Sequence, residues 1–511
     1  MGVLAWDKGI NPMKLFGAGK PDHPMAEAKE MRRLLDALPV TDPLKALEEL
    51  AHWHESVGTA EGFRPDARIQ VLFSIDEAAQ ARLRKVAAEY LSVARPARFQ
   101  ENRMWTHVYE YYRQCGHAYG LSVDAVLQGA KGAEAAKPLL PALAARALRT
   151  VAQQVKWLHL RYGPVDAGLW RLLNGLYTFA EARDLLDSIV APYPGGGDST
   201  PRQEYLRAVL LDISSPDSLL PHEMEAAERL IAELAPSFAM DTKGGATLTH
   251  WTDLGQAAAP LRLARLPQST TGLRFFGAGA ALGALQAIIR RTESSGQLPA
   301  AFKGLAQFGN EAAIELMQHL VLYWSLTPPE RKHPRHNVKS RLTIIHGFEG
   351  LIGALSGARP GEDRQAENWI VENVSAGGFG AVVPQAKGDW LKIGELLAMQ
   401  PDGGNNWIVG MVRRVTKTAG QEARVGIETL SRSPHLAHFA LGGEEEPAVL
   451  LPAAGLGTGE ASIAMRAGAY VSGQNLENQR GGRSFVYMPQ VVAERGDDYD
   501  IVRFREMVRE A

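Results

Sequence analysis

A basic segment, Arg331-Lys332-His333-Pro334-Arg335, opens the part of the chain from which the fold can be inferred, and a polar, glycine-rich segment, Asn373-Val374-Ser375-Ala376-Gly377-Gly378, closes it. The residue before Pro334 is disfavoured in helical conformation, so the two arginines lie on an extended or turning segment. Between the two segments, the run Trp369 to Val374 is rich in β-branched and aromatic residues and predicts a strand. We therefore predict an arginine pair that leads into one strand and a polar pair at the end of another.

These residue types are suited to a small nucleotide site. Arginine grips phosphate with two parallel hydrogen bonds and stacks on flat rings. Asn373 and Ser375 are two apart on a strand, so their side chains share one face and can read the edge of a base. Gly377 and Gly378 leave room for a ring near the backbone. The alternative is structural: a solvated basic strand start, and a turn in which the polar side chains bond to their own backbone.

At these residues the chain resembles the PilZ domain, a bacterial receptor for cyclic di-GMP, over about residues 328–440. That family carries an RxxxR motif followed by [D/N]xSxxG on a later strand, and both are complete here. The resemblance implies a six-stranded antiparallel β-barrel with a terminal helix, and residues 350–365 would then be an inserted loop. It also implies that two arginines hold the phosphates and guanine, that the polar pair meets the guanine edge, and that a glycine gives clearance. The implied ligand-binding residues are Arg331, Arg335, Asn373, Ser375 and Gly378.

The composition indicates a chain of several globular domains. The 511 residues are 45% hydrophobic, which is enough to bury more than one core. Basic and acidic residues nearly balance, with a formal net charge of -2, so bulk electrostatic binding to nucleic acid or an anionic membrane is not expected. The single cysteine, Cys115, excludes an internal disulfide, and no signal-peptide pattern opens the chain. We expect a cytoplasmic protein.

Helical periodicity dominates the N-terminal part. The stripe Leu83, Val86, Tyr90 repeats at helical spacing, and Cys115 lies on a second such stripe, where we expect a small buried side chain and not a nucleophile. Asp42-Pro43 and Thr200-Pro201 read as helix starts. We predict a multidomain α + β protein: an N-terminal all-α bundle or array, an antiparallel PilZ-like barrel and a small C-terminal β extension. The predicted domains are an irregular arm (1–25), a helical lobe (26–195), a second helical lobe (196–326), the barrel (328–440) and the β extension (441–511).

Two further stretches bear on the predictions for the membrane and for the barrel. The apolar run from Phe275 to Ile289 is too short to span a bilayer, so we expect a buried helix hairpin and no membrane insertion. Its glycines, Gly277, Gly279 and Gly283, imitate a dinucleotide fingerprint, but the third is one residue late and no strong strand precedes them. After the barrel strands, residues 431–439 could form the barrel's closing helix, limited by Pro434 to a short one.

The function that these patterns favour is a cyclic di-GMP receptor that relays the second-messenger level to a protein partner through its helical region. We expect no enzyme, no cofactor and no metal site, because no nucleophile elbow, zinc-binding histidine pair or Walker sequence is present. The alternative is a degenerate PilZ-like scaffold or interaction protein that does not bind nucleotide. A third possibility, an RNA-binding barrel, would need aromatic residues interleaved with the cations, and those near the motifs are scattered.

Overall fold

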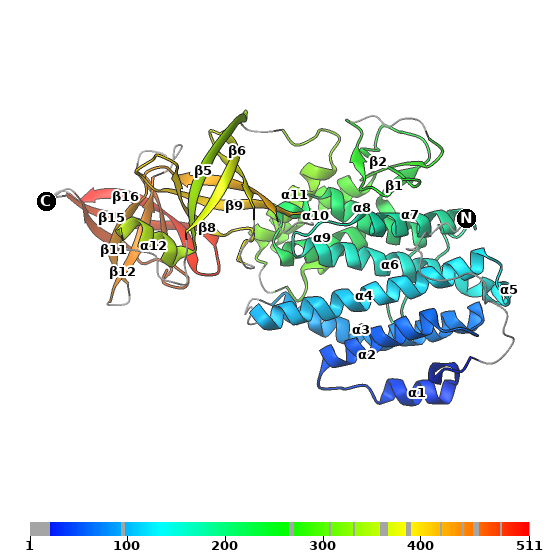
Figure 1. The fold of residues 1–511 in the computed structure, drawn as a ribbon. Helices are drawn as coiled ribbons and strands as arrows, with labels where there is room; N and C mark the ends of the chain where they lie inside the picture. Colours follow the sequence, from blue (N-terminus) through cyan, green and yellow to red (C-terminus); the bar gives the residue numbers. More distant parts are fainter. Residues whose placement is uncertain are drawn as a thin grey trace. The chain divides into compact units, whose positions relative to one another are not determined.

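The computed structural model describes residues 21–92, 98–264, 270–305, 308–330, 333–357, 366–384, 390–418, 422–441, 444–452, 459–480 and 483–509. Two compact units are distinguished. The first runs to Pro329 except for two short loops, Tyr162–Pro164 and Asp217–Leu220, and the second contains these loops and the chain from Glu330 onward. Helices make up most of the first unit and strands most of the second (Figure 1). The predicted multidomain α + β class is confirmed.

Packed helices build the N-terminal part, and α4 packs against α2, α3 and α6. Asp42 and Thr200 cap α2 and α8, each with a proline in the first turn, as predicted. The helices are η1 (Pro24–Ala26), α1 (Ala28–Asp36), α2 (Pro43–Thr59), α3 (Pro65–Tyr90), α4 (Arg98–Leu127), α5 (Ala133–Ala136), η2 (Lys137–Leu139), α6 (Leu140–His159), α7 (Ala167–Glu181), α8 (Pro201–Ile213), η3 (Pro216–Ser218), α9 (Pro221–Leu234), η4 (Ala235–Ser237), α10 (Ala281–Ser295), η5 (Ala300–Phe302) and α11 (Asn310–Trp324).

The core of the first helices contains a buried polar cluster centred on Asp76 of α3. Its carboxylate accepts hydrogen bonds from the hydroxyls of Tyr111 and Tyr119 on α4, at 2.9 and 2.8 Å. Tyr193, in the proline- and glycine-rich segment 192–197, donates to the same carboxylate at 3.0 Å. Cys115 of α4 is fully buried beside this cluster, as expected for a core cysteine. Burial raises the pKa of its thiol, so the thiolate that nucleophilic chemistry needs is disfavoured.

A small antiparallel sheet interrupts the helical pattern and was not predicted. Its order is β1-β4-β2-β3. The expected helix hairpin over Phe275 to Ile289 is wrong, because β4 ends at Gly277 and a single helix, α10, follows. The strand β4 therefore leads into these glycines, contrary to the expectation. A Cβ at Gly277 would lie 2.5 Å from the carbonyl oxygen of Thr247, so the close approach of the two backbones requires glycine there. The strands are β1 (Ala239–Asp241), β2 (His250–Asp253), β3 (Leu261–Arg262) and β4 (Leu273–Gly277).

The second unit contains a closed barrel with the strand order β10-β7-β6-β5-β8-β9, in agreement with the predicted six antiparallel strands. Side chains that alternate along the strands fill its interior, among them the fully buried Trp369 and Leu342. The strands are β5 (His336–His346), β6 (Glu367–Ser375), β7 (Gly378–Val383), β8 (Leu396–Pro401), β9 (Ile408–Lys417) and β10 (Ala423–Ser431).

Two predictions about the surroundings of the barrel are wrong. Residues expected to be an inserted loop begin with a helix, α12 (Phe348–Ser356), whose Phe348 and Leu351 are buried against the barrel. Residues expected to form a closing helix instead form β11, the first strand of a second sheet. That sheet has the order β11-β12-β13-β16-β15-β14. Its further strands are β12 (Glu444–Leu451), β13 (Glu460–Arg466), β14 (Leu476–Arg480), β15 (Arg483–Arg495) and β16 (Tyr499–Arg509), and β11 spans His435–Leu441.

The two edge strands of the second sheet, β11 and β14, contact each other. The side-chain amide of Asn478 on β14 donates to the carbonyl oxygen of His438 on β11 at 3.1 Å. The second sheet also shares a core with the barrel. The hydroxyl of Tyr499 donates to the carbonyl oxygen of Gly394 at 2.6 Å, and Asp498 accepts from the backbone N–H of Phe348 at 2.7 Å. The predicted β extension is therefore a nearly closed barrel packed on the first. No helix within the described residues combines the length and apolar character that crossing a bilayer requires.

Candidate functional site

The strand register brings the two sequence motifs to the same end of the barrel. β5 and β6 lie side by side (Figure 1) and pair antiparallel. In this register His336 lies opposite Val374, and Asn337 lies opposite Asn373. Arg335 immediately precedes β5, and Ser375 is the last residue of β6. The start of β5 and the end of β6 are thus neighbours, although about forty residues separate them along the chain.

The basic segment is described in part. Arg331 and Lys332 lie outside the described residues, whereas Arg335 is described and exposed. The ring of His333 lies close to Gly377, because its carbon Cδ2 would be 3.1 Å from a Cβ placed on that glycine. His333, two residues before Arg335, therefore lies against the turn between β6 and β7.

Asn373 is held over the neighbouring strand by a glycine. A Cβ at Gly380 of β7 would lie 2.6 Å from the Asn373 side-chain nitrogen, so only glycine leaves room for this amide. β6 shifts register next to Asn373 in its pairing with both neighbouring strands. The shift lies between Val371 and Asn373 in the pairing with β7, and between Asn337 and Ser340 in the pairing with β5. Such bulges re-aim side chains near functional sites. Asn373 is partly buried, with its amide at the end of the barrel.

The turn between β6 and β7 is anchored from within and from β10. The Ser375 hydroxyl donates to the carbonyl oxygen of Gly378 at 3.4 Å, a weak bond that a ligand can replace. The N–H of Thr429 donates to the carbonyl oxygen of Gly377 at 2.9 Å. Ser375 pairs with Gly378 in the β6–β7 ladder, which holds its backbone while the hydroxyl can rotate.

Gly378 has a structural reason to be glycine. A Cβ at this position would collide with the carbonyl oxygen of Ile427, because β7 and β10 approach closely where the barrel closes. Clearance for a ligand is therefore not needed to explain this glycine, and the assignment of Gly378 to ligand binding stays a prediction.

One cation beside the turn was not predicted. Arg432 follows β10, is exposed, and directs a guanidinium nitrogen to the carbonyl oxygen of Ala376 at 3.5 Å. No sequence signal marks it, because it belongs to neither motif. In contrast, Arg413 on β9 is fully engaged in ion pairs with Glu428 and Glu494. Burial alone would lower the pKa of Arg413, but the carboxylates of Glu494 and Glu428 outweigh burial and raise it.

The arrangement offers cations, one amide and one hydroxyl around a single turn, which is the chemistry of phosphate and base-edge recognition. Within the described residues, no group of three histidine, cysteine or acidic side chains is placed to hold a metal ion.

A closed six-stranded antiparallel barrel with RxxxR before its first strand and [D/N]xSxxG at the β6–β7 turn defines a PilZ-type domain, here joined to a helical region. Residues 29–243 match the family described as the N-terminal domain of the cyclic-di-GMP receptor FimW, and residues 358–435 match its middle PilZ domain. The two matches together cover more than half of the 511 residues, and the chain belongs to the FimW family of cyclic-di-GMP receptors. No curated protein matches the chain.

The matched ranges treat the two motifs differently. The middle-domain match contains Asn373, Ser375 and Gly378, whereas Arg331 and Arg335 precede its first residue, 358. The two arginines therefore stay a prediction from the sequence motif, and of the two only Arg335, next to β5, is described.

Proposed function

We propose that this chain binds cyclic di-GMP at the β5–β6 end of the barrel, through Arg331, Arg335, Asn373, Ser375 and Gly378. The observation that carries the proposal is the antiparallel register that sets the start of β5 beside the end of β6. Family membership supports the same ligand, since both matched domains are described as parts of a cyclic-di-GMP receptor.

Each side chain has a role that follows from its chemistry. The guanidinium groups of Arg331 and Arg335 bind phosphate oxygens or guanine acceptors and can stack on the base. The amide of Asn373 offers both a donor and an acceptor, and the Ser375 hydroxyl can rotate to either role at the guanine edge. One observation supports the alternative of a scaffold that does not bind nucleotide. The packing of Gly378 against β10 explains this motif residue without a ligand.

The binding signal passes to a protein partner through the helical region in this proposal. Only residues 325–335 separate the end of α11 from β5. The arginines belong to this connection between the two units, so a ligand that orders them also restricts the connection. A ligand that favours one state of this connection by about 1–3 kcal/mol would change the output appreciably.

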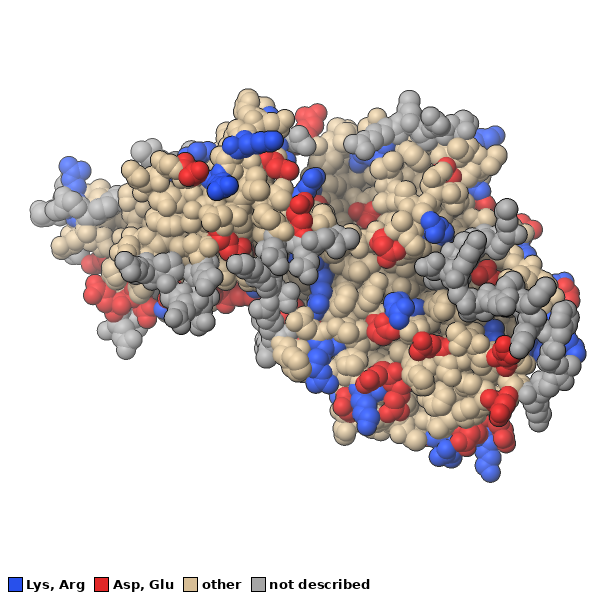
Figure 2. Space-filling view, viewed as in Figure 1, with Lys and Arg blue, Asp and Glu red and all other residues tan. Residues whose placement is uncertain are grey.

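The proposal describes a receptor and not an enzyme, and it places the protein in the cytoplasm, where its buried cysteine stays reduced. It includes no nucleic-acid partner. On the face in view, Figure 2 shows acidic and basic side chains interspersed over the helical unit, without the continuous basic track that nucleic-acid binding uses.

A thermal-shift comparison of cyclic di-GMP, GTP and a short RNA tests the proposal. A ligand present at 100 times its dissociation constant stabilises the unit that binds it by about 2.7 kcal/mol. We expect the barrel to be stabilised by cyclic di-GMP alone. Stabilisation by none of the three would favour the scaffold alternative, and stabilisation by the RNA would favour an RNA-binding barrel.

A further inference from the structure

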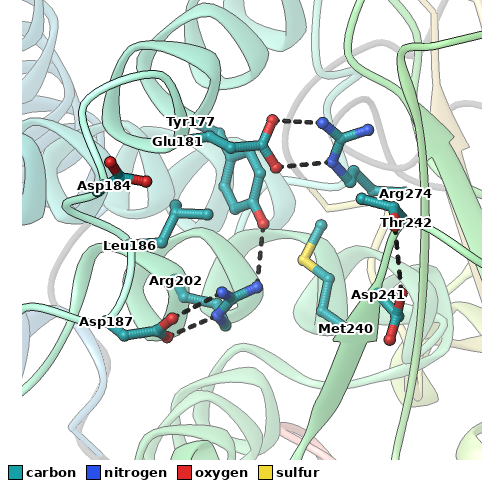
Figure 3. A pocket seen from close by; sticks show the side chains of 10 residues that line it. All are labelled: Tyr177, Glu181, Asp184, Leu186, Asp187, Arg202, Met240, Asp241, Thr242 and Arg274. Carbon is teal, nitrogen blue, oxygen red and sulfur yellow. Dashed lines mark hydrogen bonds and ion pairs between the residues drawn. The ribbon is translucent and has the colours of Figure 1, made fainter.

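A cavity of about 440 Å³ opens between the helices and the small sheet of the first unit, and no residue of the nucleotide site lines it (Figure 3). α7 contributes Tyr177 and Glu181, the following loop contributes three residues, and α8, β1 and β4 complete the wall. Its volume falls in the range of small-ligand pockets.

The two arginines of this cavity are already neutralised. Arg202 forms two parallel hydrogen bonds to Asp187, at 2.8 and 2.9 Å, and a third nitrogen approaches the Tyr177 hydroxyl at 3.4 Å. Arg274 is held in the same way by Glu181, and its remaining nitrogen donates to the carbonyl oxygens of residues 271 and 273. An anionic ligand would have to break these pairs, so the cavity does not favour one.

Acidic side chains outnumber basic side chains in the wall of this cavity. Besides the paired Glu181 and Asp187, the wall contains Asp184 and Asp241, and neither carboxylate forms an ion pair with any described residue. They lie on opposite sides of the cavity in Figure 3. The cavity therefore has an excess of negative charge at two separate points.

Apolar groups lie between these two acids. Leu186 is buried, and Met240 points into the space between the two ion pairs (Figure 3). Burial raises the pKa of Tyr177 to about 12, so its hydroxyl is neutral and can accept a hydrogen bond from a cationic group. A long cationic side chain fits these surroundings, because its methylene groups can pack on the apolar side chains while its charged group reaches a carboxylate at the edge.

We propose that this cavity receives an arginine side chain of a protein partner, with the guanidinium at Asp184 or Asp241 and the stem over Leu186 and Met240. Arginine fits because its planar fork pairs with a carboxylate through two hydrogen bonds. The proposal deepens the proposed relay through the helical region and rests on that part of the proposed function.

The test uses the full chain without cyclic di-GMP, so its outcome is independent of nucleotide binding. The probes are the tripeptide acetyl-Gly-Arg-Gly-amide and its citrulline analogue, which has nearly the same shape but no charge. The readout is the ¹³C-methyl signal of Met240, assigned with the Met240→Leu variant. We expect the arginine peptide to shift this signal saturably, more strongly at low salt, and the citrulline peptide to have no effect.

Neutral variants locate the charge. Asp184→Asn suits the left-handed backbone there (φ 55°), which asparagine tolerates, and Asp241→Asn changes an exposed carboxylate. We expect each to weaken peptide binding about two- to fivefold, as for an exposed ion pair. Glu293→Gln, an exposed acid on α10 outside the cavity, is the matched control and should bind as the unmodified protein does. Equal shifts with the citrulline peptide, or unchanged affinity in the Asp184→Asn/Asp241→Asn double variant, would overturn the proposal.

Discussion

Among single residues, Gly380 determines where the candidate reader of the base edge can lie. The side chain of Asn373 occupies the space that a Cβ at this position would need. Gly380 belongs to neither motif, so its importance follows from the pairing of β6 with β7 and not from the sequence pattern.

Gly380→Ala should therefore weaken cyclic di-GMP binding without removing any proposed contact residue. The added methyl group displaces the Asn373 amide, and losing one hydrogen-bonding group costs about 1–1.5 kcal/mol, or about tenfold in affinity. Isothermal titration calorimetry measures this directly. Gly353→Ala on α12 is the matched control, because a Cβ there meets no atom within 4 Å. Equal affinities of the two variants would argue against Asn373 as a ligand contact.

The residue spacing predicted part of this site. Two residues apart on a strand, Asn373 and Ser375 were expected on one face at the strand end, and the strand β6 is confirmed with Ser375 as its last residue. The packing of Gly378 against β10 and the position of Arg432 could not be predicted, since both depend on which strand closes the barrel. The structure does not describe Arg331, so its role stays a prediction.

The helical elements are joined by buried charges as well as by apolar contacts. Glu204 of α8 is fully buried, and it accepts hydrogen bonds from Arg149 of α6 at 2.9 Å and from the Ser199 hydroxyl. Burial alone would raise the pKa of Glu204, but the guanidinium groups of Arg207 and Arg149 outweigh burial and lower it. Glu204 is thus a charged group on which the α6–α8 contact depends.

Glu204→Gln should destabilise the first unit by about 3 kcal/mol, because removing one partner of a buried ion pair leaves the others uncompensated. Urea unfolding followed by helical circular dichroism measures the effect. The exposed pair Arg33–Glu30 on α1 provides the control variant Glu30→Gln, which should leave the midpoint nearly unchanged. A Glu204 variant as stable as this control would show that the buried pairs do not hold these helices together.

Long periodic helices were predicted well, and short or mixed elements were not. β11 was predicted as a helix, although burial alternates there, with Ala437 and Phe439 buried and His438 exposed between them. α12 contains Gly350 and Gly353, which lower helix propensity, so its helicity comes from packing Phe348 and Leu351 into the core. Strands of two to five residues, such as those of β1–β4, are too short for an alternating pattern to be recognised.

At the scale of the whole molecule, two buried histidines make the first unit sensitive to acid. Burial lowers the pKa of His54 to about 3, and its Nδ1 has no hydrogen-bond partner. Burial, with a smaller effect of Arg262, lowers the pKa of His250 to about 4. Both imidazoles stay neutral in the folded unit, whereas the unfolded chain takes up protons below its ordinary pKa of about 6.5.

The free energy of unfolding of the first unit should therefore have its full histidine contribution at pH 7 and decrease as the pH falls through 6.5. Each histidine contributes a loss of about 1 kcal/mol between pH 7 and 5.5. His54→Gln and His250→Gln should each flatten the pH dependence of the unfolding free energy in this window by that amount. Carboxylates whose pKa is lowered, such as Glu204, lose their contribution only at more acidic pH. Parallel pH profiles of the variants and the unmodified protein would contradict this account.

The central claim is that the segment before β5 and the end of β6 form one nucleotide site. Calorimetric titration of the full chain with cyclic di-GMP tests it most directly, using Arg335→Ala against Arg341→Ala, an exposed arginine within β5. We predict that Arg335→Ala weakens binding by about 10- to 100-fold, since a charge-assisted contact contributes about 1.5–3 kcal/mol, whereas Arg341→Ala binds as the unmodified protein does. Equal binding by both variants, or no binding by the unmodified chain at micromolar ligand, would contradict the claim.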